Sequence, residues 1–343
     1  MDINANFSLL SRLVMAGLFA TCVGVAHAAP PKEQKAIVQK AGSEAMQLQT
    51  VPVPAPAANQ VLIRVYAAAV NPTDWKNGAP SADVVPGADV AGVVAAVGEG
   101  VTGFKVDDPV WGIAVRRPGL LNGGYSEYAV AAVANVVHKP ANITYAEAAG
   151  LGIATVTAVR IVEQTRVAKG QRVLITGVAG GVGSAAAQAA KAKGAYVIGT
   201  ASAQHNAYLK SIAVDEVIDY TKVAFEKQVS NVDAVIDTVG GDNATRAMTT
   251  LRRGGWFIST GNHDLDAECA KAGVNCAPYS SAADADRRFY EQLTSLVSEG
   301  KLKINVDEKY PLADAMKAQA YSKAGHAEGK IILIVDAAQA EKK

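Results

Sequence analysis

The 343-residue sequence predicts an α/β protein built of two parts, a compact β-barrel and a parallel sheet covered by helices on both faces. Strand-like segments punctuated by glycine and proline occupy the region from about residue 35 to residue 145. Beyond residue 145 strands alternate with helices, which is typical of a parallel sheet. A glycine-dense turn, TGVAGGVGSA at 176–185, follows an apolar run within this second region.

The first 28 residues resemble a cleaved secretory signal peptide. Arg12 precedes an apolar stretch at about 13–25, and AHA at 26–28 offers the small residues that signal peptidase accepts. The stretch is too short to span a bilayer comfortably, although a retained anchor is the alternative. We therefore expect a periplasmic or secreted protein with no stable membrane span after cleavage.

Charge and cysteine content narrow the function classes. The formal net charge is +1 and basic runs are absent, so the sequence gives no reason to expect a nucleic-acid partner. Cleavage would leave two cysteines, Cys269 and Cys276 in ECAKAGVNC. In an oxidising compartment such a pair forms either a disulfide, which we favour, or two separate thiols, and two ligands are too few for a metal site.

The expected elements follow in chain order. The barrel contains strands in VLIRVYAAAV (61–70) and DVAGVVAAVGEGV (89–101). The second part has strands at 173–176, 196–200, 217–220, 232–238 and 256–260, and helices at 184–193, 204–212 and in NATRAMTTLRRGG (243–255). A last strand, GKIILIVD at 329–336, is expected to return to the barrel. This predicts one domain at 35–150, completed by about 300–336, and a second at 151–299.

The glycine turn predicts a dinucleotide site. Gly177, Gly180 and Gly183 are spaced three residues apart between a strand and a helix. Such glycines allow a tight turn, close approach of the backbone to a pyrophosphate, and close packing of the helix on the strand. The alternative is a tight strand–helix turn without a ligand.

The end of the next strand favours NADP(H) as the cofactor. NAD-selecting folds place Asp or Glu there to bind the ribose 2′-hydroxyl, whereas this chain has Thr200 and no carboxylate before Asp215. Ser202 and His205 could hydrogen-bond a 2′-phosphate instead. Tyr220, at the end of the third strand, either reaches the same phosphate or is an ordinary strand-end tyrosine.

Six ordered motifs resemble the medium-chain dehydrogenase/reductase superfamily, and its zinc-free quinone oxidoreductase (zeta-crystallin-like) branch most closely. They are AAAVNPTDWK, VPGADVAGVVAAVGEGVTGF, GGYSEYAV, LITGVAGGVG, GTASAQHNAYLKSIAVDEVIDY and DAVIDTVGG. The resemblance covers nearly all of 35–336. It implies a GroES-like barrel as the catalytic domain, a Rossmann domain, a cleft between them and, often, a homodimer.

The resemblance also argues against a metal. Positions that hold the catalytic zinc ligands in zinc-dependent relatives match Asn71, Ala88 and Leu151, and the cysteine-rich zinc lobe is missing. These side chains are poor zinc ligands, so no metal site is expected. Without a Lewis acid, the favourable chemistry is hydride transfer from NADPH to an electron-poor small-molecule acceptor, either a quinone or an α,β-unsaturated carbonyl.

The resemblance suggests the site residues. Asn71, Lys76 and Tyr128 are the candidate catalytic residues, as a partner of the nicotinamide or carbonyl, an enolate hydrogen-bond donor and a proton donor, respectively. Lys76 as a solvated lysine and Tyr128 as a packing residue are the alternatives. The further cofactor-binding candidates are Thr155, Ala179, Gly181, Val182, Thr238, Gly240, Gly261 and Lys330. The competing hypothesis for the whole chain is an exported, non-catalytic binding protein on the same fold, because NADPH is scarce outside the cytoplasm.

Overall fold

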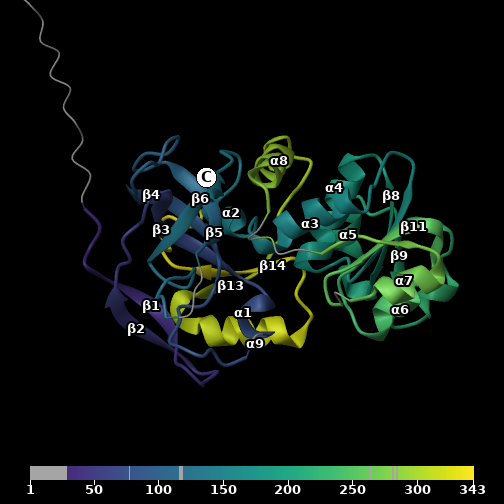
Figure 1. The fold of residues 1–343 in the computed structure, drawn as a ribbon, viewed down its shortest axis with the longest axis horizontal. Coiled ribbons are helices and arrows are strands. Elements are labelled where there is room, and N and C mark those ends of the chain that lie inside the picture. The colour runs from purple at the N-terminus through teal and green to yellow at the C-terminus, as the bar shows by residue number, and fades with distance from the viewer. Residues whose placement is uncertain (1–28, 77, 116–118, 263, 280–281, 283–284) are drawn as a thin grey trace, which may run out of the picture.

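A computed structural model describes residues 29–343 except 77, 116–118, 263, 280–281 and 283–284. The expected signal peptide at 1–28 lies outside the described residues. The chain forms two halves, a strand-rich half on the left of Figure 1 and a helix-flanked sheet on the right. Helices α2 (Tyr145–Ala149), α3 (Ile153–Gln164) and α8 (Arg287–Ser298) lie between them.

The first half is an antiparallel barrel extended by two C-terminal strands, β13 and β14, which pair with each other in parallel. One six-stranded sheet has the order β13-β14-β3-β4-β5-β6, and an additional pairing of β3 with β6 closes the barrel. Its strands are β3 (Gln60–Val70), β4 (Asp89–Val97), β5 (Pro109–Ala114), β6 (Tyr128–His138), β13 (Val306–Pro311) and β14 (Lys330–Ile334). A separate pair, β1 (Glu33–Gln39) and β2 (Met46–Pro52), packs on it together with η4 (Leu312–Asp314) and α9 (Ala315–Ala324). The short helix α1 (Thr73–Lys76) follows β3.

The second half is a six-stranded parallel sheet with the order β12-β11-β10-β7-β8-β9. The order reverses between β7 and β10, as in a doubly wound fold. Its strands are β7 (Arg172–Thr176), β8 (Tyr196–Ala201), β9 (Glu216–Asp219), β10 (Val232–Asp237), β11 (Leu251–Ser259) and β12 (Asn275–Cys276). The connecting helices are α4 (Gly181–Ala192), η1 (Ala203–His205), α5 (Asn206–Ser211), η2 (Phe225–Lys227), α6 (Asp242–Met248) and α7 (Asp266–Ala272).

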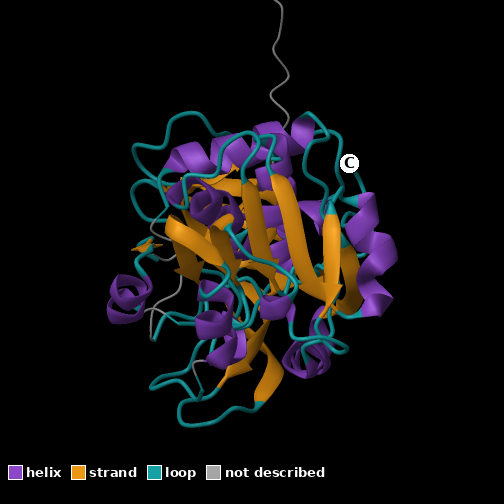
Figure 2. Ribbon diagram, turned by 90° about the vertical axis from the view of Figure 1, so that its right-hand side faces the viewer, coloured by secondary structure: helices purple, strands orange, loops and turns teal. Residues whose placement is uncertain are grey.

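Alternating side chains of β7 fill both faces of this sheet. Val173 and Ile175 belong to a core shared with α3 and α4, whereas Leu174 belongs to the core on the opposite face, with α6. Figure 2 shows helices on both sides of the strands. A strand buried on both faces explains the continuous apolar run of β7, and the predicted α/β class with a Rossmann-like sheet and a GroES-like barrel is confirmed.

One expected helix is shorter than predicted. The segment 243–255 was expected to be helical throughout, but α6 ends at Met248 and Leu251 already belongs to β11. Leu251 pairs with Val232 of β10, so the hydrogen bonds of the sheet override the helical propensity of the segment. The two-residue strand β12, which the sequence did not indicate, ends at Cys276.

The structure joins Cys269 of α7 to Cys276 of β12 in a disulfide, with Cα atoms 5.8 Å apart. This bond attaches the helix to the edge strand of the parallel sheet. Among the described helices, none is both long and apolar enough to cross a membrane.

Candidate active site

The glycine loop between β7 and α4 forms a cradle. Gly177 has φ +63°, which favours glycine. A Cβ atom on Gly183 would lie 2.4 Å from the Gly177 carbonyl oxygen, so a side chain there would push α4 away from the turn. A Cβ on Gly180 would meet only that oxygen within 4 Å, at 3.6 Å. This open side, beside the free N–H groups expected in the first turn of α4, fits a pyrophosphate.

The predicted ribose-end residues follow β8 and β9. Thr200 is buried, and its Oγ1 accepts a hydrogen bond from the Gly177 N–H at 3.3 Å, so this side chain shapes the loop. Ser202 is half-buried directly after β8, and His205 is the last residue of η1. Tyr220, which follows β9, is 56 % exposed. Ser202 and His205 therefore lie at the carboxyl end of the sheet, where a ribose is expected.

A buried carboxylate organises the carboxyl ends of three neighbouring strands. Asp237, fully buried at the end of β10, accepts hydrogen bonds from Thr176 Oγ1 and Ser259 Oγ, both at 2.6 Å. It also accepts from Asn243 Nδ2 at 2.7 Å and from the Gly240 N–H at 3.0 Å. These bonds fix the turns after β7, β10 and β11 relative to one another.

Three predicted cofactor residues gather around this point. Thr238 Oγ1 donates to the Thr176 carbonyl at 2.7 Å. A Cβ on Gly261 would lie 2.8 Å from the Gly240 Cα atom, so glycine allows the two turns to touch. Thr238, Gly240 and Gly261 thus lie together next to the glycine loop.

The barrel contributes a buried polar cluster centred on Asn71, which follows β3. Asn71 Nδ2 donates to Asp89 Oδ2 at 2.8 Å, and Asn71 Oδ1 accepts from Lys330 Nζ at 2.6 Å. Lys330 Nζ and Asp89 Oδ2 are 3.7 Å apart, an ion pair that the amide bridges. The Ile153 N–H donates to Asp89 Oδ1 at 2.8 Å. A Cβ on Gly152 would lie 2.2 Å from that oxygen, which explains a glycine there.

Burial dominates the electrostatics of this cluster. Loss of solvent raises the pKa of Asp89, and the Lys330 ammonium and the Asn71 amide oppose the shift. Loss of solvent likewise lowers the pKa of Lys330, opposed chiefly by Asp89. Each charge therefore depends on the other to remain ionised in a site from which water is excluded.

The same lysine connects the cluster to the glycine loop. The Gly329 N–H donates to the Ala179 carbonyl at 2.9 Å, and Gly329 forms a bridge with Gly180. A Cβ on Gly181 would lie 3.0 Å from Lys330 Cδ. Lys330 was expected to contact the cofactor; the structure shows its ammonium on Asn71 and its stem against the loop.

Of the two tyrosines in GGYSEY, the structure connects Tyr125 to the cluster. Tyr125 OH donates to Asp74 Oδ2 at 3.1 Å, and the same oxygen accepts from the Asn71 N–H at 2.9 Å. Tyr128 pairs with Arg64 in the middle of β3. Along an extended strand, Arg64 lies roughly 23 Å from Asn71. The structure therefore does not bring Tyr128 to the cluster.

The other predicted residues have structural contacts of their own. Lys76 is exposed, with Nζ 5.8 Å from the centre of the Trp75 ring. Thr155 is buried, and its Oγ1 donates to the Gly150 carbonyl at 2.7 Å. Val182 lies half-buried in the first turn of α4.

Sequence reasoning missed three carboxylates. Asp89 and Asp237 each interrupt an apolar strand, ADVAG and VIDTV, and a charge inside such a run is a signal that could have identified them. Glu328, which contacts His205, carries no comparable local signal, because the two residues are far apart in the sequence.

Comparisons with known proteins agree with this architecture. Residues 57–141 match the family model described as "Alcohol dehydrogenase GroES-like domain", and residues 212–333 match "Zinc-binding dehydrogenase". A quinone oxidoreductase of Sus scrofa is 34 % identical over 320 residues, covering 86 % of this chain and 95 % of that protein. A 2-methylene-furan-3-one reductase of Solanum lycopersicum is 33 % identical, covering 82 % of this chain and 74 % of that protein.

A solved structure shows the same fold. The quinone oxidoreductase from Coxiella burnetii is similar with a TM-score of 0.79 and 32 % identity, covering 89 % of this chain and all of that one. The identity and coverage of these relatives, with the barrel, the parallel sheet and the glycine loop, lead to one conclusion. The chain belongs to the medium-chain dehydrogenase/reductase superfamily and is an oxidoreductase whose relatives include quinone oxidoreductases.

Proposed function

We propose that this chain is a zinc-independent oxidoreductase that uses NADPH to reduce a quinone or an α,β-unsaturated carbonyl compound. The names of the Sus scrofa and Solanum lycopersicum relatives support the two acceptor classes. When bound, the nicotinamide cofactor supplies a hydride, and a solvent proton completes the two-electron reduction.

The buried ammonium of Lys330 is the observation that carries the proposal of zinc independence. At the three positions matched to zinc ligands the chain has an amide, Asn71, and two buried apolar side chains, Ala88 and Leu151. Lys330 Nζ lies 2.6 Å from the amide oxygen. A divalent cation at this place would be repelled by the ammonium, and the described residues form no group of three or more His, Cys, Asp or Glu side chains that could hold it.

The chain's own residues hold the cofactor and respond to charge on the acceptor. The glycine loop and the first turn of α4 receive the pyrophosphate, and the absence of a carboxylate at 200–206 favours a 2′-phosphate. As the acceptor oxygen becomes negative, an N–H of the Asn71 amide stabilises it. Asp89 and Lys330 orient the Asn71 amide for that task.

The test is NADPH oxidation with a panel of quinones and enones, measured with and without a metal chelator. We expect turnover that the chelator leaves unchanged. Asn71→Ala should lower kcat/KM by about 100-fold, whereas Asn142→Ala, which removes an amide bonded to Val297, should leave it unchanged. No turnover with any acceptor, or stoichiometric zinc in the active protein, would reject the proposal.

We also propose that the chain is exported. The Cys269–Cys276 disulfide supports an oxidising compartment. N-terminal sequencing of the protein recovered from a cell fraction tests this, with Ala29 as the expected first residue. A cytoplasmic protein that retains residues 1–28 would contradict it.

A further inference from the structure

A side-chain hydrogen bond connects the segment before β14 to η1, which follows β8. His205 Nδ1 lies 2.9 Å from Glu328 Oε2, and the two side chains are 12 % and 28 % exposed. Because a carboxylate only accepts hydrogen bonds, Nδ1 is the donor. Figure 1 shows the connection from α9 to β14, in yellow, running along the boundary between the two halves. The pair therefore joins the barrel half to the Rossmann half.

The backbone holds Glu328 in place beside the glycine loop. The Glu328 N–H donates to Asp307 Oδ2 at 3.0 Å, and its carbonyl accepts from Asn305 Nδ2 at 2.6 Å. The next residue, Gly329, donates its N–H to the Ala179 carbonyl within the loop. The backbone at Glu328 is thus fixed by contacts on both sides, and one of them is with the proposed pyrophosphate cradle.

This position is where a dinucleotide fold distinguishes NAD from NADP. The discriminating residue ordinarily follows the second strand of the sheet, which here is β8, ending at Ala201. The chain has no carboxylate between Thr200 and Asn206. Glu328 brings one to His205 from a segment more distant in the sequence.

We infer that Glu328 is a specificity-determining residue that competes with the cofactor's 2′-phosphate for His205 and so weakens the preference for NADPH over NADH. The inference rests on the proposed function, because it assumes that the loop binds a nicotinamide dinucleotide. A 2′-phosphate that binds His205 must come close to Glu328, whose carboxylate lies 2.9 Å from the His205 ring. The two negative groups repel each other. NADH has a ribose hydroxyl there instead, and this hydroxyl can donate a hydrogen bond to a carboxylate.

Glu328→Gln tests the inference, because the amide keeps the size and an acceptor oxygen but removes the charge. The dissociation constants of NADPH and NADH would be measured by nicotinamide fluorescence on the chain from Ala29 onward, without any acceptor. We expect the ratio of the NADH constant to the NADPH constant to rise about ten-fold, mainly through tighter NADPH binding. Glu341→Gln, which removes an equal charge from the exposed pair with Lys309, should leave the ratio unchanged.

The His205→Ala background separates competition from a general charge effect. If Glu328 acts through His205, the ten-fold change should largely disappear in that background. If Glu328→Gln changes the ratio of dissociation constants by the same factor when His205 is replaced by alanine, Glu328 does not act through His205 and the inference is overturned. If wild type binds both cofactors and Glu328→Gln does not alter their ratio, the inference is wrong and the proposed function stands. If wild type binds neither cofactor, the proposed function fails and the inference fails with it.

Discussion

Replacing Lys330 with methionine removes the ammonium that lies 3.7 Å from the carboxylate of Asp89. At an effective dielectric constant of about 20, two unit charges at this distance attract each other by roughly 4 kcal/mol. Methionine fills similar space, so the main cost is a buried carboxylate without its cation. Removing one partner of a buried pair typically costs about 3–5 kcal/mol, and we expect the free energy of unfolding to fall by that amount.

The pH dependence of this variant has a defined sign. Burial raises the pKa of Asp89 above its value of 3.8, so the folded state binds a proton more readily than the unfolded chain. Without Lys330 the carboxyl gains this proton more easily still. The destabilisation should therefore shrink as the pH falls from about 8 to about 5.

Urea unfolding of wild type, Lys330→Met, Asp89→Asn and the double variant gives the coupling energy of the pair. We expect a coupling of about 2 kcal/mol or more, with the double variant less destabilised than the sum of the single ones. Lys309→Met, which breaks an exposed pair with Glu341, is the control and should cost less than about 1 kcal/mol. A coupling below about 0.5 kcal/mol would refute the reasoning, because the two charges would then not depend on each other.

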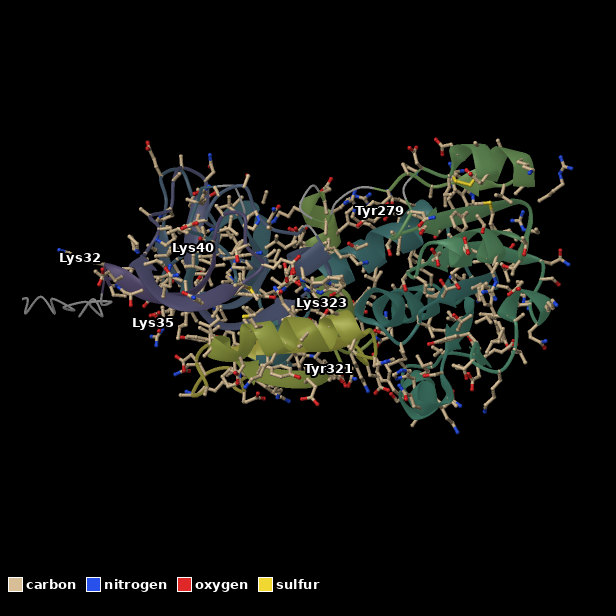
Figure 3. All side chains as sticks on the ribbon, turned by 90° about the horizontal axis from the view of Figure 1, so that it is seen from below. Lys32, Lys35, Lys40, Tyr279, Tyr321 and Lys323 are labelled. Carbon is tan, nitrogen blue, oxygen red and sulfur yellow. A yellow bond between two sulfur atoms is a disulfide. The ribbon has the colours of Figure 1, made fainter. Side chains whose placement is uncertain are left out.

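Further measurements address three other features. Tyr321, labelled on α9 in Figure 3, donates to Asp307, which raises its pKa from 10.0 to about 12. Because the folded-state pKa is the higher, this bond contributes stability fully below pH 10 and loses it as the pH rises through about 12. The tyrosinate absorbance would be followed against pH in wild type and in Tyr321→Phe, and the difference between the two curves reports the ionisation of Tyr321. An ionisation near pH 10 would contradict the raised pKa. Replacing Cys269 and Cys276 with serine should lower the free energy of unfolding, measured by urea denaturation, by about 2–3 kcal/mol. Unchanged stability would show that the disulfide contributes nothing. Gly183→Val should weaken NADPH binding about ten-fold or more in a fluorescence titration, because its side chain meets the turn that forms the cradle; unchanged affinity would remove the loop from the site.

The fold was predictable from local patterns, whereas the contacts of the site were not. The periodicity of the strands and the glycine turn indicate the parallel sheet, because both signals lie within short segments. The exact start of β11 was missed, because pairing of Leu251 with Val232 depends on a strand elsewhere in the chain.

For the site, too, single residues could be predicted from the sequence, whereas the contacts between them could not. Asn71 and Lys330 could each be selected from sequence, but their hydrogen bond spans 259 positions, and no local pattern encodes such a contact. Glu328 is the sharper example. The sequence after β8 indicates a ribose site without a carboxylate, and only the three-dimensional arrangement brings Glu328 to His205.

The pairing of β14 with β3 has a consequence for the order of folding. Ile331 lies opposite Val70, so the barrel sheet joins strands from nearly opposite ends of the described chain. The strands of the parallel sheet all lie between β7 and β12 in the sequence, so they can pair with one another before β14 joins the barrel. Lys330, the first residue of β14, supplies the cation on Asn71. The buried cluster is therefore completed last, and a folding chain that already has its glycine loop still lacks the cation of its candidate active site.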